Sequence, residues 1–302
     1  MYDKDSKGIS YSAGFFMLIA FTIAGFFLYA IISAPVWTAL TGKPALEMGK
    51  GLLDPANSNA GKVMQSLYAI IGFFLPAVFT AFLLNRRPMN LLGFSRHINP
   101  RQVGLVVLIV ASALFVGGAL SYFNYHIPVP ADWRVKFDKL ETDYNQQVQA
   151  IVRLNNLSDY IIAMVVMGFL PAFCEETLFR GGLQNFLYRA TRSSWLAIII
   201  VSIIFSLVHF SFYGFLFRFF LGFVLGWIYN YSGKIWLNIL AHFLNNAVVI
   251  TVYYIYTNQN KPLSEVTDDT IGSYWGLAVL PLLIVLLLVL KRISFNSKSQ
   301  QS

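Results

Sequence analysis

The sequence predicts an all-α membrane protein, a polytopic bundle of about eight transmembrane helices in one domain that spans residues 1–302. Of the 302 residues, 57% are hydrophobic and only 12% are charged, whereas about a quarter of the residues in a soluble domain are charged. The apolar residues also come in blocks of about twenty, the length that a helix needs to cross a hydrocarbon core of about 30 Å. These observations exclude a water-soluble fold.

Eight apolar blocks are candidates for membrane spans. The first block follows Lys4 and Lys7 and is longer than the apolar region of a secretory signal, so we expect a retained anchor. The longest polar interval, residues 124–159, carries apolar residues at near-helical spacing, which is typical of an amphipathic helix at the membrane surface or of an ordinary extramembrane helix. The expected spans are Ala13–Ala34, Val63–Leu84, Val103–Phe123, Tyr160–Tyr188, Ser194–Phe210, Phe215–Tyr231, Ile235–Tyr256 and Tyr274–Leu290.

Lysine and arginine residues predict the orientation, because cytoplasmic loops are enriched in them. With the N-terminus inside, the cytoplasmic segments hold twelve such residues and the opposite segments hold eight, half of them in the long interval 124–159. We therefore expect both termini in the cytoplasm. The twelve residues are Lys4, Lys7, Arg86, Arg87, Arg96, Arg101, Arg189, Arg192, Lys234, Lys291, Arg292 and Lys298.

The net charge of +8 points to the lipid bilayer as a partner and not to nucleic acid. The cationic residues are scattered between apolar blocks, and this pattern fits loops that meet anionic lipid headgroups. Cys174 is the single cysteine, so an intrachain disulfide and a thiolate metal cluster are both excluded.

Glu175 and Glu176 are the only two of the fourteen acidic residues that lie inside a predicted span. Charges in hydrocarbon are costly, so both side chains should face the bundle interior. Arg180 follows Glu176 by four residues and can pair with its carboxylate on the same helix face. That pair either supports a site or only fixes helix packing. Glu175 points about 100° away around the helix, which suits a general base that faces water.

Two of the four histidines, His209 and His242, also lie inside predicted spans, and Asn246 follows His242 by one helical turn. A single histidine in a span is often an ordinary interhelical hydrogen-bonding residue. Counted from the cytoplasmic helix ends, however, Glu175 and His209 both lie at a depth of about 21–22 Å. Asn246 comes to about 18 Å and His242 to about 12 Å, a difference that helix tilt can offset. The residues therefore favour one shared site.

Three motifs in this order on successive spans resemble those of the CPBP family: Glu175-Glu176-x-x-x-Arg180, Phe205-x-x-x-His209 and His242-x-x-x-Asn246. This family comprises CAAX prenyl endopeptidases of the Ras-converting type and bacterial relatives linked to bacteriocin processing or self-immunity. The resemblance covers about residues 170–249. It implies an intramembrane endopeptidase with a catalytic core at about residues 157–256, a bacterial plasma-membrane location, and a peptide or protein substrate, including membrane-anchored ones.

The resemblance also implies a role for each motif residue. Glu175 and His209 activate a water, His242 and Asn246 stabilise the oxyanion of the scissile peptide, and Glu176 and Arg180 support the motif helix. No cofactor is certain. A zinc site would use Glu175, His209 and His242 with water as the fourth ligand, but Asn246 would be an unusual zinc ligand, which favours the metal-free version.

Two other classes of function stay open. A proton-coupled transporter also buries Glu, His and Arg residues, although no inverted repeat is visible in this sequence. A non-catalytic immunity or scaffold protein would keep the fold and bind a partner, and the intact motifs disfavour it. Outside the motifs, we expect Arg218 to extend to the membrane interface and Gly222-x-x-x-Gly226 to pack closely against another helix.

Overall fold

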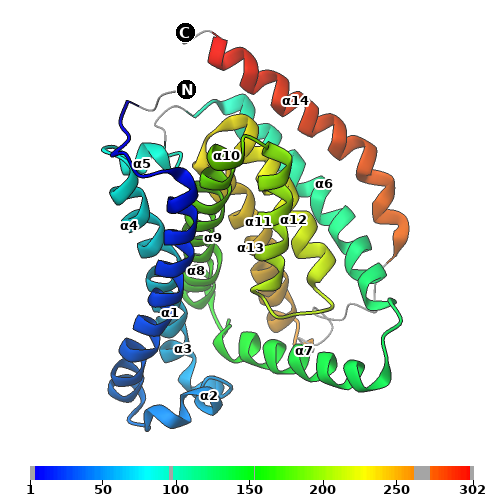
Figure 1. Ribbon diagram of the computed structural model, residues 1–302. Helices are drawn as coiled ribbons and strands as arrows, with labels where there is room; N and C mark the ends of the chain where they lie inside the picture. Colours follow the sequence, from blue (N-terminus) through cyan, green and yellow to red (C-terminus); the bar gives the residue numbers. More distant parts are fainter. Residues whose placement is uncertain (1–3, 95–97, 153, 262–272, 300–302) are drawn as a thin grey trace.

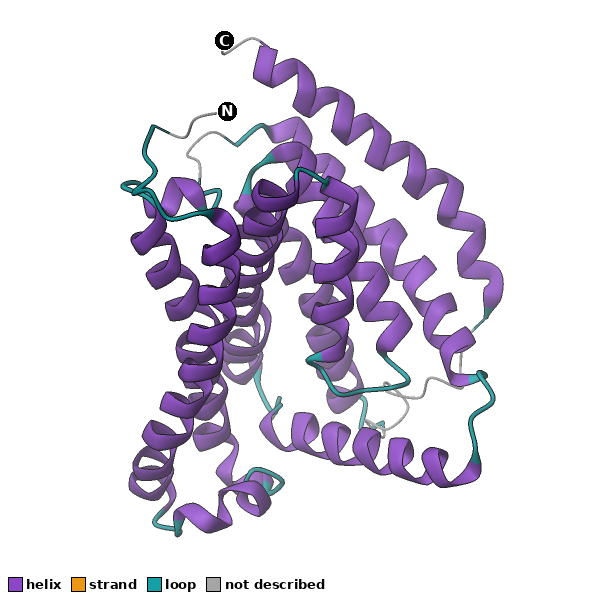
Figure 2. Ribbon diagram, in the orientation of Figure 1, coloured by secondary structure: helices purple, strands orange, loops and turns teal. Residues whose placement is uncertain are grey.

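The computed structural model describes residues 4–94, 98–152, 154–261 and 273–299, and their regular elements are helices (Figure 2). The all-α prediction is confirmed. Arg96 and Arg153, two of the loop charges counted for the orientation, lie outside the described residues. The α-helices are α1 (Tyr11–Thr41), α2 (Met48–Gly51), α3 (Ser58–Ala69), α4 (Leu75–Leu84), α5 (Pro88–Leu91), α6 (Pro100–Tyr125), α7 (Ala131–Ile151), α8 (Leu157–Ala163), α9 (Leu170–Glu176), α10 (Asn185–Thr191), α11 (Ser194–Leu207), α12 (Phe215–Ser232), α13 (Ile235–Asn258) and α14 (Leu280–Ser299).

Within the described residues, six helical stretches are long and apolar enough to cross a membrane. The membrane bundle is therefore confirmed, whereas the number of eight full spans is not. The two remaining predicted spans are the helices α11 and α12, of 14 and 18 residues. At about 1.5 Å per residue they reach about 21 Å and 27 Å, short of a core of about 30 Å. The six stretches are Tyr11–Thr41, Pro55–Leu84, Pro100–Tyr125, Leu157–Thr191, Ile235–Asn258 and Tyr274–Phe295.

The outer surface of these helices is apolar, as contact with lipid requires. Phe16, Phe27 and Ile31 of α1 are 69%, 69% and 70% exposed, and Phe115 of α6 is 64% exposed. Such large apolar side chains are costly in water, at about 25 cal/mol per Å², but not against lipid tails. The exposed surface therefore agrees with a membrane location.

The bundle has two different ends (Figure 1). The start of α1 and the end of α14 lie at one end, together with α5 and the α10–α11 connection. Helix α7 lies across the opposite end, beneath the α11–α12 connection. The helix predicted within residues 124–159 is thereby confirmed, and it covers the end of the bundle that is remote from the termini.

Two apolar clusters flank the helices that carry the motifs. One joins α1 and α4 to α9 and α11, with Phe73 and Phe205 among its buried residues. The other joins α6, α12 and α14 to α13, with Leu225 and Ala241 among its buried residues. Since the three motifs lie on α9, α11 and α13 and the segments that follow them, burial of these two faces holds the motifs between the clusters.

The motif helix itself is not a regular α-helix. The continuous stretch Leu157–Thr191 contains two π-helical segments, η4 (Met164–Phe169) and η5 (Thr177–Gln184), on either side of α9. Pro171, at the start of α9, lacks the backbone N–H that would bond to the carbonyl four residues earlier, and that carbonyl lies in η4. π-Helical turns occur frequently at functional sites, and here they bracket Glu175 and Glu176.

Glycines let α12 approach its neighbours closely, as the Gly222-x-x-x-Gly226 spacing predicts. A Cβ atom on Gly222 would lie 3.1 Å from Ser202 Cα of α11, and one on Gly226 would lie 3.0 Å from Gln184 Oε1 of η5. Both distances are too short for ordinary contact, so the predicted close packing is confirmed.

Replacing the first of these glycines should therefore destabilise the bundle. We expect Gly222→Ala to lower the free energy of unfolding by about 1–3 kcal/mol, because α11 and α12 must move apart. Gly118→Ala in α6 is the matched control, since no atom lies within 4 Å of its added Cβ. Thermal unfolding in detergent measures both, and equal midpoints for the two variants would contradict the packing argument.

Candidate active site

A fully buried network joins the first and third motifs. Arg180 Nη1 donates to Glu176 Oε1 over 2.8 Å, and both side chains are 0% exposed. His242 Nδ1 lies 2.9 Å from the same carboxylate oxygen, and Asn238 Nδ2 donates to Glu176 Oε2 over 3.3 Å. The predicted Glu176–Arg180 pair is therefore present, and its carboxylate has three donors from two helical segments.

Arg180 connects this network to two more helices. Its Nη2 donates to the backbone carbonyl of Gly222 in α12 over 3.2 Å. Its guanidinium lies 4.6 Å from the ring centre of Phe205 in α11, within the range of a cation–π interaction. One buried arginine thus ties η5 to α11 and α12.

Hydrogen bonds assign the proton positions on both motif histidines. The acceptor at His242 Nδ1 is a carboxylate that already pairs with Arg180, so Nδ1 must donate. The acceptor at His209 Nδ1 is the carbonyl oxygen of Phe205, at 2.7 Å, so this Nδ1 donates as well. In each neutral ring Nε2 is then an acceptor.

Phe205 contacts both motif histidines. Its ring centre lies 5.1 Å from that of His209 and 5.8 Å from that of His242, both in edge-to-face geometry. The Phe205-x-x-x-His209 motif therefore contributes an aromatic ring that packs on both imidazoles, as well as an imidazole of its own.

Glu175 differs from its neighbour in having a buried oxygen without a partner. Its Oε2 makes no hydrogen bond to any described residue. Glu175 and His209 interact electrostatically with the same three side chains, Arg180, His242 and Arg218. His242 thus lies within electrostatic range of both Glu175 and His209, and Glu175 Oε2 is buried without a hydrogen-bond partner among the described residues.

Asn246 lies one turn beyond His242 and makes separate contacts. Its amide donates to the carbonyl of Gly168 in η4 over 3.3 Å and accepts from Asn245 Nδ2 over 3.2 Å. An amide nitrogen carries two hydrogens, so one Nδ2 hydrogen is left for another acceptor. Within the described residues, the hydrogen bonds do not join Asn246 directly to the five other predicted site residues.

A metal site is not preformed by the side chains that the structure describes. Among them, no group of three His, Cys, Asp or Glu residues is placed to hold a metal ion. Glu175, His209 and His242 therefore do not form a ready zinc site in this conformation.

Two contributors to the site were not among the predicted site residues. Asn238 precedes His242 by four residues on α13, so the same helical spacing that selected Asn246 could have selected it. Arg218, which was expected to extend to the membrane interface, is half-buried: its Nη1 is buried without a hydrogen-bond partner among the described residues, and its guanidinium lies 5.6 Å from the ring centre of Tyr144 in α7. A Cβ on Gly214 would lie 2.2 Å from that nitrogen, so the guanidinium occupies the space that this glycine leaves.

Helix α7 holds the chain segment that follows His209. Ser211 Oγ donates to Glu141 Oε2 over 2.6 Å, and the Tyr213 hydroxyl donates to Asp138. The rings of Phe212 and Phe137 stack with centres 4.4 Å apart. The amphipathic helix thereby anchors the α11–α12 connection and covers this end of the site.

The fold and these side chains define a membrane-embedded, Glu- and His-containing site of the kind that the three motifs imply. Residues 157–248 match the family described as Type II CAAX prenyl endopeptidase Rce1-like. The matched region contains all six predicted site residues, so the resemblance seen in the motifs is confirmed.

The chain is also similar to a curated protein that is named as a membrane peptidase. The Bacillus subtilis (strain 168) protein named "Putative membrane peptidase YdiL" is 24% identical to this chain over 186 residues, which cover 62% of this chain and 71% of that protein. No solved structure matches the chain. The description of the family and the name of the relative both refer to peptidases.

Proposed function

We propose that this protein is an intramembrane endopeptidase that hydrolyses peptide bonds with a water activated by Glu175 and His209. The observation that carries the proposal is the contrast between two adjacent acids. Both oxygens of Glu176 accept hydrogen bonds, from three donors in all, whereas Glu175 Oε2 is buried without a hydrogen-bond partner among the described residues. A purely structural acid would need that partner, because an unpaired carboxylate inside the bundle has no packing benefit to offset its cost.

The proposed reaction uses Glu175 first as a base and then as an acid. Glu175, assisted by the acceptor Nε2 of His209, takes a proton from water while the water oxygen bonds to the carbonyl carbon. The carbonyl π electrons move to oxygen and form an oxyanion. When the C–N bond breaks, the same proton passes to the leaving amine.

Donors on α13 would stabilise that oxyanion. Asn246 has one Nδ2 hydrogen left after its bond to Gly168. His242 uses Nδ1 for Glu176, so it can donate from Nε2 only when a second proton is bound there, and Glu176 lies next to that imidazolium. Donors of this kind stabilise developing charge most strongly where water is excluded.

The orientation proposed from the loop charges places the reaction on the outer side of a bacterial plasma membrane. His209 follows the end of α11 that lies near α7, and the termini lie at the opposite end of the bundle (Figure 1). If the termini are cytoplasmic, peptides and membrane-anchored proteins reach the site from outside the cell.

Cleavage of a quenched peptide library by the purified, detergent-solubilised protein tests the proposal. We expect cleavage that survives a zinc chelator, because no three-residue metal site is preformed among the described residues. Loss of cleavage with chelator and recovery with zinc would favour the zinc mechanism. Absence of cleavage by folded protein across a broad library would contradict the peptidase and favour the scaffold or transporter.

Arg218 is proposed to bind an oxygen of the substrate. Its guanidinium lies 5.6 Å from the Tyr144 ring centre, but its buried Nη1 has no hydrogen-bond partner among the described residues, and its charge acts on both Glu175 and His209. We expect Arg218→Gln to raise KM by about 10–100-fold with a smaller change in kcat, because a charged hydrogen bond contributes about 1.5–3 kcal/mol. Arg218→Lys should recover part of the loss.

The matched control for this prediction is Lys139→Gln, which removes an exposed cation from α7 at the same end of the bundle. Steady-state kinetics on a cleaved library peptide separate KM from kcat. An unchanged KM in Arg218→Gln, or an equal rise in Lys139→Gln, would contradict the proposed contact.

A further inference from the structure

Helix α7 covers the end of the bundle at which the proposed catalytic His209 lies. It crosses this end beneath the α11–α12 connection (Figure 1), and that connection contains His209. The ring centre of Tyr144 on α7 also lies 5.6 Å from the guanidinium of Arg218, which we propose to bind the substrate. A peptide that approaches the site from this end of the bundle therefore meets α7 first.

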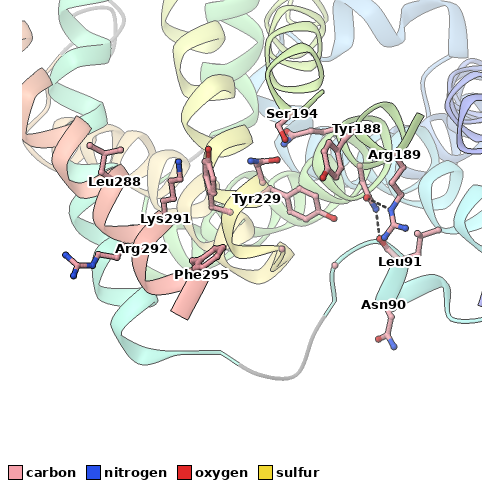
Figure 3. A pocket seen from close by; sticks show the side chains of 16 residues that line it. Asn90, Leu91, Tyr188, Arg189, Ser194, Tyr229, Leu288, Lys291, Arg292 and Phe295 are labelled. Atoms are coloured by element: carbon pink, nitrogen blue, oxygen red, sulfur yellow. Dashed lines mark hydrogen bonds between the residues drawn. The ribbon is translucent and has the colours of Figure 1, made fainter. Parts of the chain in front are cut away.

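The cavity at the other end of the bundle is remote from these residues. It has a volume of about 690 Å³ and lies among α10, α12 and α14, with Tyr188 and Lys291 in its lining (Figure 3). Ser194, at the start of α11, lines this cavity, whereas His209 follows the opposite end of the same helix. Because α11 has 14 residues and rises about 1.5 Å per residue, a helix length of about 21 Å separates the cavity from His209.

Helix α7 is fixed to the membrane helices at its C-terminal end. Its buried residues are Ala150 and Ile151, the last two residues of the helix. Ser58 Oγ, at the start of α3, donates to the Ile151 carbonyl over 2.9 Å. A Cβ atom on Gly61 of α3 would lie 2.9 Å from Ile151 Cγ1, so the two helices are in close contact there. The next residue, Val152, is buried in an apolar cluster with residues of α13.

The rest of α7 is held by a few contacts on its surface. No side chain of residues 131–149 is buried. Near the start of the helix, the guanidinium of Arg134 lies 5.7 Å from the ring centre of Tyr125. Three pairs, which we call the latch, join α7 to the α11–α12 connection through two hydrogen bonds and one ring stack: Glu141–Ser211, Asp138–Tyr213 and Phe137–Phe212.

This distribution of contacts is that of a helix that can swing about one end. Segments with few buried apolar contacts open at a low cost in free energy, and the buried contacts of α7 lie at its C-terminal end. Trp133, Val135 and Leu140 are 54%, 69% and 49% exposed. An amphipathic helix with such side chains is stable in the membrane interface, so α7 has a place to lie when it leaves the bundle.

We propose that α7 is a lid that must swing away, with Ile151 as its hinge, before a peptide reaches the candidate active site. This regulation rests on the proposed peptidase function. The latch holds the lid closed, and release of the latch opens the way across the α11–α12 connection to His209 and Glu175. Lids of this kind control the entry of substrate and exclude water from the site.

A tether across the latch tests the lid. In the full-length variant Phe137→Cys/Phe212→Cys, a short bifunctional maleimide joins the two positions whose rings stack in the closed state. Cleavage of a library peptide should be lost in the tethered protein. It should persist when the same variant is labelled with N-ethylmaleimide, which modifies both cysteines without joining them. Single variants treated with the bifunctional reagent control for reaction at the buried Cys174.

Acylation of His209 by diethylpyrocarbonate is a second measurement, and it does not require peptidase activity. The acceptor Nε2 of the imidazole reacts, and mass spectrometry gives its rate, with the exposed His126 as the reference in the same sample. In Asp138→Ala/Glu141→Ala, His209 should react at least about tenfold faster than in the wild type, because the lid loses both hydrogen bonds to charged acceptors.

Asp132→Ala/Asp143→Ala is the matched control, because it removes two exposed carboxylates of the same helix that do not belong to the latch. His209 should react at the wild-type rate in this variant. Undiminished cleavage by the tethered protein, or equal His209 rates in the two double variants, would overturn the lid. If folded, untethered protein cleaves no peptide, the peptidase proposal fails, and the His209 rates alone then decide the lid.

Discussion

Glu175→Gln is expected to lower kcat/KM for peptide cleavage by about 10²–10⁴-fold, the usual contribution of a positioned general base. The substitution keeps the size of the side chain and removes its ability to take a proton. Since Glu175 Oε2 has no hydrogen-bond partner among the described residues, the protein should remain folded. The measurement is steady-state cleavage of a library-derived peptide together with the thermal unfolding midpoint of the same preparation.

Asp132→Asn is the matched control, because it neutralises an exposed carboxylate on α7. It should cleave at the wild-type rate. Wild-type cleavage by a folded Glu175→Gln variant would refute the assignment of Glu175 as the base.

Glu176→Ala is expected to cause the largest loss of stability, about 3–5 kcal/mol, because it leaves a buried charge without its counter-ion. Arg180 would keep its bond to the Gly222 carbonyl and its contact with Phe205, but neither neutralises the charge. His242 would also lose the acceptor that fixes its Nδ1 proton. The variant should therefore unfold at a lower concentration of denaturing detergent than the wild type, and its rate of peptide cleavage should also be lower.

A double variant separates the two roles considered for this pair. Glu176→Leu/Arg180→Met removes both charges, and replacement of a buried ion pair by apolar residues is often neutral. We expect stability to recover while cleavage stays low, because His242 still lacks its carboxylate partner. Recovery of both properties would assign the pair to helix packing alone, and full stability of Glu176→Ala would contradict the buried network.

Local spacing in the sequence was enough to predict the features that depend on one helix. Composition and block length predicted the all-α membrane bundle, and the four-residue interval between Glu176 and Arg180 predicted their ion pair. The first prediction follows from the length of helix that crosses a hydrocarbon core, and the second from the helical period, since residues four apart lie on one face of a helix. The same reasoning did not establish eight full spans, because the apolar blocks of α11 and α12 form helices of only 14 and 18 residues.

Tertiary structure decided every contact between residues that are distant in the chain. Glu176 meets His242 across 66 positions, and the charge of Arg218 reaches Glu175 and His209 although its spacing suggested only an interfacial residue. The docking of α7 on the α11–α12 connection depends on how helices pack in three dimensions. A sequence shows which face of a helix is polar, but the partner of that face depends on packing with segments far away in the chain.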